Sequence, residues 1–245
     1  MDRERARSTG RRRSVPTSPA ALLSLLHFGD SAFPTGGYAH SFGLEAYCQA
    51  GVVRDAHGVE RFLLAHLEGS AGPCDATAAV GTSRAMARGD VDACRRLDET
   101  VEAMKPARTV REGSRQMGRQ TLRVAAALTG DGRLVAYHEA ASGGGVPGHH
   151  APAFGMAAGV LGWGADETAT AFLYSTCALL VGAALRLLPL GQLEGQHVLW
   201  RLHPAIARIA REATARDPAD LSAFAPGLDI AAMRHARLET RLFRS

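Results

Sequence analysis

The chain has 245 residues, of which 46% are hydrophobic and 6% aromatic, which is enough to bury the core of one sizeable domain. Its formal charge is +4, but residues 1–19 hold six arginines against two acidic residues, so the rest of the chain is close to neutral. A nucleic-acid-binding domain carries its basic surface on the fold itself, so this distribution argues against one. Isoleucine occurs only three times, which favours helices over sheets.

The N-terminal segment differs in composition from the rest of the chain. Residues 1–19 are rich in arginine and poor in apolar side chains, and we predict a disordered tail there. Residues 20–245 are then expected to form one domain. Ala20–Phe28 has the pattern of a short helix, and it leads into the turn-rich passage Asp30–Gly37, whose proline and glycines exclude regular helix.

The next segments show apolar residues at steps of three and four, which predicts helices. The first of them ends at a Gly-Pro pair that we expect to break it, and the third follows an aspartate in the capping position. The predicted helices are His57–Ser70, ended by Gly72 and Pro73, then Asp75–Arg88, and a segment from Val91 to Met104 capped by Asp90.

The segment Arg108–Thr129 has the most regular helical pattern, and the glycines Gly130 and Gly132 end it. Arginines recur along one side of it at helical spacing, namely Arg108, Arg111, Arg115, Arg119 and Arg123. Such a face is either solvated or a docking surface for an acidic partner, since guanidinium binds carboxylates in a bidentate way. Glu112 can pair locally with Arg108 and Arg115. We expect Arg111 and Arg115 to matter for partner assembly rather than for folding.

The second half of the chain continues the helical pattern after a glycine-rich loop. The uncharged stretch Ala169–Leu185 is shorter than the ~20 apolar residues of a membrane span, so we expect a buried core helix and no membrane. The predicted elements are the loop Ser142–His150, the helices Phe154–Leu161 and Glu167–Leu188, two helices Leu193–Leu202 and Ala205–Ala215 hinged at Pro204, and a last helix from Asp229 toward Phe243. The expected fold is all-α, with about eight to ten helices.

Catalytic and cofactor motifs are weak. Asp30, Ser31 and His40 are close in sequence, but no nucleophile elbow accompanies them, and Gly36-Gly37 lacks the lysine of a nucleotide-binding loop. We therefore expect no enzyme activity and no stably bound cofactor. The four cysteines Cys48, Cys74, Cys94 and Cys177 form no CxxC motif and fit reduced thiols in a cytoplasmic protein.

Ten histidines raise the question of a metal site. His149 and His150 lie in a glycine-rich loop and could bind a borderline metal such as nickel. Adjacent histidines do not easily share one ion without outside ligands, so we predict no dedicated metal site and keep this pair as weak candidates. An alternative reading of the chain is a helical metal-dependent hydrolase that uses His149 or His150.

The unusual segments of this chain resemble the UreF family of urease accessory proteins. The passage Asp30–Glu45 resembles a signature near the start of that family. Further similar patches are Ser114 with Gly118, Arg119 and Gln120, then His150–Gly155, then Pro189–Gln192 with Gly195 and Gln196, and finally His235 with Arg241–Ser245. They follow the family order over residues 22–245. Two positions depart from it, because Ala39 replaces an expected serine and Glu239 an expected aromatic residue.

The resemblance implies an all-α homodimer that acts as a non-catalytic scaffold. It implies binding to a UreD-type partner (also called UreH) and to the GTPase UreG, and delivery of nickel to apo-urease by that assembly, with the ion handled only transiently. The expected interface residues are Gly36, Gly37, Tyr38, His40, Phe42, Glu45, Arg111, Arg115, Arg119, Gln120, Gln192, Gln196, Arg241, Leu242 and Phe243.

The end of the chain carries the sharpest of these expectations. Leu242 and Phe243 are adjacent large apolar residues near the last position, where exposed side chains gain little. We expect them to insert into the UreD-type partner, and the alternative is that they fold back onto their own core. A further rival function is a regulator that binds nucleic acid through residues 1–19, and it predicts salt-sensitive binding.

Overall fold

The computed structural model describes residues 18–245, so the predicted basic tail lies outside the described part except for Ser18 and Pro19. Ser18 caps the first helix by accepting a hydrogen bond from the amide of Ala21, and Pro19 occupies the first helical position. Every regular element between residues 18 and 245 is helical, which confirms the all-α prediction.

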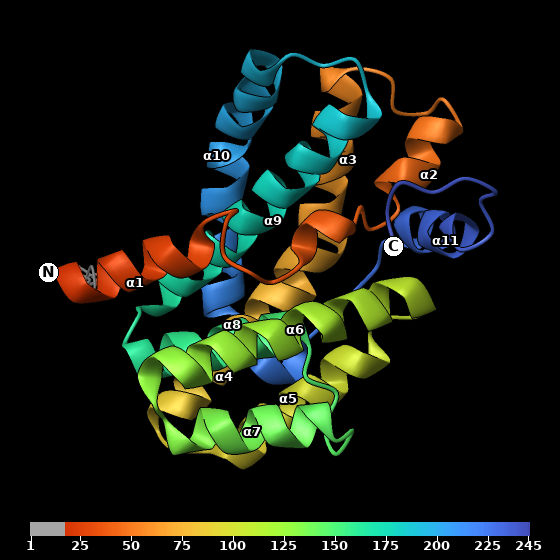
Figure 1. Cartoon of the computed structure of the whole chain (residues 1–245). Coiled ribbons are helices and arrows are strands. Elements are labelled where there is room, and N and C mark those ends of the chain that lie inside the picture. Colours follow the sequence, from red (N-terminus) through yellow and green to blue (C-terminus); the bar gives the residue numbers. More distant parts are fainter. Residues whose placement is uncertain (1–17) are drawn as a thin grey trace, which may run out of the picture.

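The helices are labelled in Figure 1. In chain order they are α1 (Pro19–Gly29), the short 3-10 helix η1 (Gly37–Ala39), α2 (Leu44–Gln49), α3 (Ala56–His66), the π-helix η2 (Leu67–Ala76), α4 (Thr77–Ala87), α5 (Val91–Ala103), α6 (Arg108–Thr129), α7 (Gly132–Ser142), α8 (His150–Leu161), α9 (Ala165–Leu187), α10 (Gln192–Ala215), the 3-10 helix η3 (Pro218–Asp220) and α11 (Pro226–His235).

The core forms where the longer helices pack in pairs. α9 lies along α10, and α4 lies along α8, which also contacts α6. Close approach of α4 and α8 depends on Gly155, because a Cβ there would collide with the carbonyl oxygen of Ala79. Figure 1 shows α6 crossing one side of the bundle, while α2 and α11 form a corner beside the C-terminus. That corner and α6 bring together most of the residues discussed below.

Helix α9 is the one described element that is long and apolar enough to cross a membrane by length and composition. Of its most apolar stretch, 56% is buried inside the protein, where it packs against α10, α4 and α1. This placement agrees with the prediction of a core helix.

Two predicted helix breaks are wrong. The chain runs from α3 through η2 into α4 across Pro73, and α10 runs through Pro204. A proline removes one amide donor and its ring pushes against the carbonyl of the preceding turn, so a helix continues through it where neighbours satisfy the freed groups or the turn widens. At η2 the carbonyls of Gly69 and Pro73 accept hydrogen bonds from the amides of Phe224 (2.7 Å) and Ser222 (3.3 Å). These partners come from a distant loop, which the local sequence pattern does not reveal.

Other boundaries were predicted better. Asp90 caps α5 as expected, and Gly130 ends α6 in the left-handed conformation. The helices α2, which has six residues, and α7 were not predicted, and each follows a glycine-containing turn. The prediction that the last helix runs toward Phe243 is wrong, because α11 begins at Pro226 and ends at His235, and the chain beyond it runs back over the protein.

Candidate partner interface

The last residues of the chain fold back and are held by one buried carboxylate. Glu45 in α2 is 1% exposed and accepts hydrogen bonds from the amides of Leu242 (2.7 Å) and Phe243 (3.1 Å). It also lies 2.7 Å from Nε2 of His235. Burial alone would raise the pKa of Glu45, but the bonds from Leu242 and His235 bring that pKa below its usual range. The residues from His235 to the chain end therefore close around Glu45 as a clasp.

A second set of contacts fixes the end of this clasp. The backbone oxygen of Ser245 accepts hydrogen bonds from the amide of Phe42 (3.0 Å) and from the amide and hydroxyl of Ser41, the hydroxyl at 2.9 Å. The Ser245 hydroxyl lies 2.8 Å from Nδ1 of His40. Burial, and then the charge of Arg244, lower the pKa of His40 to about 4, so His40 is neutral at pH 7. Phe42 has a φ of 49°, a strained conformation that these contacts stabilise.

The clasp corrects our expectation for Phe243. This side chain is 3% exposed, packs in the main core and has the guanidinium of Arg186 4.3 Å above its ring. The alternative reading, in which the tail folds onto its own protein, therefore holds for Phe243. Leu242 is 60% exposed and remains accessible to a partner.

The arginines expected to contact a partner are engaged inside the protein. Arg115 binds Glu102 of α5 through two nitrogens, with Nε at 2.8 Å. Arg111 lies 3.3 Å from the same carboxylate and donates to the carbonyl of Lys105 at 2.8 Å. These contacts tie α6 to α5, so both arginines also support the fold, and their role in partner assembly stays a prediction. Glu112 pairs with Arg108, as expected, and not with Arg115.

His149, a weak metal candidate in the sequence, belongs to the same network of contacts. It is fully buried, its Nε2 lies 2.7 Å from Glu102, and its Nδ1 lies 3.0 Å from the hydroxyl of Ser114. Both ring nitrogens thus have partners within the protein. Its amide donates to Asp98 at 2.8 Å. Burial, and then the charge of Lys105, lower the pKa of His149 to about 4.

This network also explains one of the patches in the sequence. A Cβ at Gly118 would collide with the carbonyl of Gly148, so the glycine lets the loop before α8 approach α6 closely. Asp98 accepts from the amide of Gly148 (2.7 Å) and from the hydroxyl of Tyr137 (2.9 Å). Asp98 and Glu102 were not predicted as functional residues. Their spacing of four on the predicted helix was the signal that both would face the same neighbour.

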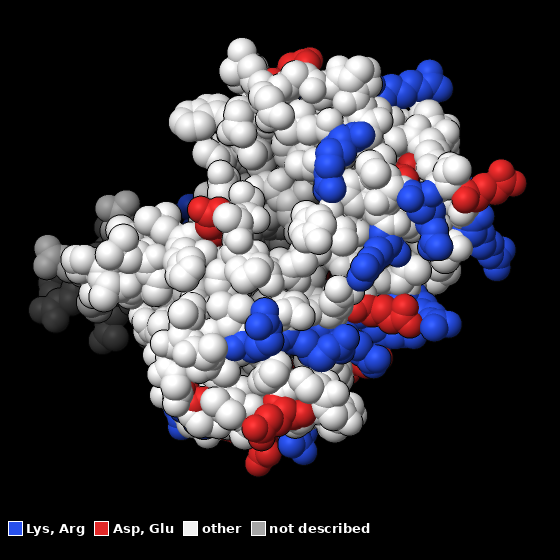
Figure 2. Space-filling view, viewed as in Figure 1, with Lys and Arg blue, Asp and Glu red and all other residues white. Residues whose placement is uncertain are grey.

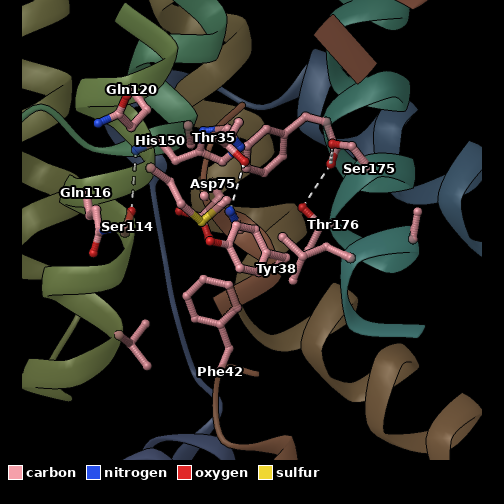
Figure 3. A pocket seen from close by; sticks show the side chains of 18 of the residues that line it. Thr35, Tyr38, Phe42, Asp75, Ser114, Gln116, Gln120, His150, Ser175 and Thr176 are labelled. Atoms are coloured by element: carbon pink, nitrogen blue, oxygen red, sulfur yellow. Dashed lines mark hydrogen bonds between the residues drawn. The ribbon is translucent and has the colours of Figure 1, made fainter. Parts of the chain in front are cut away.

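A cavity of about 880 Å³ lies between α6 and α9. Figure 3 shows Gln116 and Gln120 projecting from α6 and Ser175 and Thr176 from α9, with Tyr38 from the segment before α2 between them. His150 lines the cavity, and its Nδ1 lies 3.2 Å from the hydroxyl of Thr121. Within residues 18–245 no three or more His, Cys, Asp or Glu side chains are placed to hold one ion.

The only lysine of the chain also lines this cavity. Nζ of Lys105 lies 2.7 Å from Asp75, and both residues are buried. Burial opposes the charge on Lys105, but Asp75 holds its pKa above the usual value. No role was predicted for Lys105 from the sequence, although a single lysine among many arginines is unusual.

The remaining predicted interface residues differ in their accessibility. Gly36 has a φ of 77° and makes the turn before η1, while Gly37 is buried so closely that a Cβ would collide with Leu179. Tyr38 is 75% exposed beside the cavity. Among the others, Arg119 and Gln120 are half-buried on α6, whereas Gln192, Gln196 and Arg241 are exposed.

The structure therefore joins the family-like patches in two places. The signature Asp30–Glu45 meets the closing residues Arg241–Ser245 at the clasp. The Ser114 and Gly118 patch meets the loop that leads into His150–Gly155. Gln192 and Gln196 lie in the first turns of α10, outside both groups.

Comparison with known proteins agrees with this arrangement. A UreF family profile matches residues 53–203. A protein of Paenarthrobacter aurescens named urease accessory protein UreF is 36% identical over 91% of this chain and 97% of its own length. Proteins with the same name from Paracoccus denitrificans and from a Bacillus species are 40% and 31% identical, over 94% and 91% of this chain and 98% and 99% of their own lengths.

The fold and the clasp thus describe an all-helical accessory protein. The chain belongs to the UreF family of urease accessory proteins.

Proposed function

We propose that this chain is a non-catalytic scaffold for inserting nickel into apo-urease. In this proposal it binds a UreD-type partner and the GTPase UreG, works in the cytoplasm as a homodimer, and handles nickel only transiently within that assembly. The observation that carries the proposal is the relationship over about nine-tenths of the chain to proteins named urease accessory protein UreF.

The clasp supports a role in partner binding. It holds Leu242 at the surface, 60% exposed, while the neighbouring signature segment presents Tyr38, 75% exposed. Large apolar and aromatic side chains at the surface are the usual anchors of protein interfaces. The backbone of Arg244 is bonded to the carbonyl of Ala39, so the two anchors lie on segments that the clasp holds together.

The proposal is tested by co-purification of the full chain with a UreD-type partner. The double variant Tyr38→Ser, Leu242→Ser removes both anchors without cutting any hydrogen bond of the clasp. We expect it to lose the partner, since an interface anchor costs about 2 kcal/mol or more when truncated. Leu128→Ser in α6 is the matched control, because Leu128 is 58% exposed.

The outcome separates two cases. Retention of the partner by the control and loss by the double variant, with equal melting temperatures, supports the proposal. If the wild type and the double variant retained the UreD-type partner equally, the clasp would not be part of the interface. Failure of the wild-type chain to bind any UreD-type partner would contradict the proposed function itself.

A further inference from the structure

Two arginines on opposite walls of the cavity lack an acidic partner within residues 18–245. Arg123 of α6 donates to the side-chain oxygen of Gln120 at 2.9 Å. Arg186 of α9 donates to the carbonyls of Tyr38 (2.8 Å) and Gly182 (3.2 Å). Neutral acceptors satisfy the geometry of these guanidinium groups but leave their charges unbalanced. Each side chain is exposed, so it can reach an incoming carboxylate.

The same face carries further unbalanced arginines. Arg119 lies one turn before Arg123 on α6, and Arg244 lies beside η1, where its amide bonds to Ala39. Neither forms an ion pair in the part of the chain described by the structure. Figure 2 shows Lys and Arg side chains running along α6 and gathering again beside the C-terminal end. Elsewhere Arg201 and Arg208 are paired with glutamates, whereas Arg96, which is also exposed, forms no ion pair within residues 18–245. The arginines of this face therefore differ from Arg96 by their position beside the cavity.

The cavity between these arginines is built to receive an apolar group. The large apolar side chains of its lining include Phe28, Phe33, Phe42, Met117, Phe172 and Leu179. Its volume of about 880 Å³ is within the range of ~300–1,000 Å³ typical of ligand pockets.

The lining carries three acidic and three basic side chains, so its formal net charge is zero. Asp75 pairs with Lys105, whereas neither Asp30 nor Asp229 forms an ion pair with Arg123 or Arg186. Outside the cavity, Arg119 and Arg244 add positive charge, and long-range attraction to an anionic partner acts there.

From this arrangement we infer that the cavity and its rim dock an acidic segment of a partner protein, with one large apolar side chain inserted in the cavity and flanking carboxylates on the arginines. This inference rests on the proposed scaffold function and names the chemistry of the segment that the scaffold binds. A single apolar cavity between separated guanidinium groups fits such a segment better than a nucleic acid, which needs a continuous basic track and stacked aromatic platforms. In this inference the arginines at the cavity take the docking role that the sequence suggested for Arg111 and Arg115, whose side chains pair with Glu102.

The experiment measures fluorescence anisotropy of a labelled synthetic peptide with the full chain. The peptide carries one phenylalanine flanked by glutamates, and the comparison peptides replace the glutamates by lysines or the phenylalanine by serine. We expect saturable binding of the first peptide only. Raising the salt concentration should weaken this binding, because exposed charges are screened over about 8 Å at physiological ionic strength.

Three variants locate the site. Arg123→Glu should weaken binding by about tenfold, and Arg123→Glu with Arg186→Glu by more. Gly182→Phe should block the cavity from within, because a Cβ at Gly182 meets no atom within 4 Å and the residue lines the cavity. Arg96→Glu in α5 is the matched charge reversal outside the cavity lining and should leave the affinity within about twofold.

The results decide between clear cases. Arg186 also covers the ring of Phe243, so the double variant could release the C-terminal residues from the core. Its melting curve reveals such a release. If the melting temperature falls, the affinities of Arg123→Glu and Gly182→Phe decide the result. No saturable binding, equal binding of the serine peptide, or equal loss in Arg96→Glu would overturn the inference. Normal co-purification with a UreD-type partner together with absent peptide binding would leave the scaffold function standing and remove only this site.

Discussion

The carboxylate of Glu45 lies 2.7 Å from Nε2 of His235, although 190 positions separate them in the chain. Removing this carboxylate leaves the amides of Leu242 and Phe243 and the ring of His235 without their acceptor in a buried site. We expect Glu45→Ala to lower the free energy of unfolding by about 3–5 kcal/mol. Glu45→Gln, which keeps one acceptor oxygen, should cost less.

Equilibrium unfolding in urea measures this loss, and hydrogen exchange locates it. The amides of Leu242 and Phe243 should exchange faster in Glu45→Ala than in the wild type. Unchanged stability and unchanged protection of these amides would show that the carboxylate does not hold the chain end.

The two neighbouring residues of the tail should respond in opposite ways. Phe243→Ala empties a core position and should cost about 3–5 kcal/mol. Leu242→Ser changes an exposed side chain and should stay within about 0.5 kcal/mol of wild type, while weakening the UreD-type complex. Thermal melting and co-purification of both variants check this. Equal stability of the two variants would contradict the folded-back tail.

Arg115 should contribute to stability rather than to partner recognition. It is about one-third exposed, so solvent screens its pair with Glu102, and Arg115→Ala should cost only about 1 kcal/mol. Arg111→Glu with Arg115→Glu should cost clearly more, because it places two new carboxylates beside Glu102 and loosens the contact to His149. Chemical denaturation measures both. A double variant with wild-type stability and impaired partner binding would restore the docking role for these arginines.

The free energy of unfolding should decrease as the pH is lowered from 6.5 toward 4, because buried histidines remain neutral in the folded protein. The pKa of His40 and of His149 is lowered from 6.5 to about 4 by burial, so both stay neutral in the folded protein while the unfolded chain binds protons. Their contribution is therefore complete above pH 6.5 and is lost as the pH falls toward 4, by roughly 1.4 kcal/mol per pH unit for each histidine.

Melting temperatures at a series of pH values test this dependence. His40→Asn removes one of the four histidines whose pKa is lowered to about 4, the others being His66, His149 and His150, and it should reduce the dependence between pH 6.5 and 4, even if it lowers stability throughout. A wild-type melting temperature that stays constant from pH 7 to pH 5 would contradict the neutral state of these histidines.

The sequence was sufficient for the helices whose determinants are local. Asp90 and Gly130 cap their helices through neighbouring atoms, and the apolar spacing of residues 108–129 predicted α6 with its bounds. The break expected at Pro73 was wrong because amides of a distant loop satisfy the backbone there, and the break expected at Pro204 was wrong because α10 continues through it. Local pattern contains no information about such partners.

The candidate partner interface was predictable only in part, because it also depends on contacts between residues that are far apart in the sequence. The signature and the closing residues were recognised, but their meeting at Glu45 depends on a contact across almost the whole chain. The arginine spacing on α6 was read correctly, yet Glu102 on another helix decides that Arg111 and Arg115 are paired and Arg123 is not. Pairing across helices requires the fold.

The central claim is that this chain serves urease maturation by binding partners, and the nickel content of urease tests it most directly. Urease is purified from a urease-producing host that lacks its own UreF-family protein and expresses this chain or its Tyr38→Ser, Leu242→Ser variant. We predict that the wild-type chain restores nickel in urease and that the equally stable variant does not. Urease that stays free of nickel with the wild-type chain, although its UreD-type and UreG partners are present, would contradict the account.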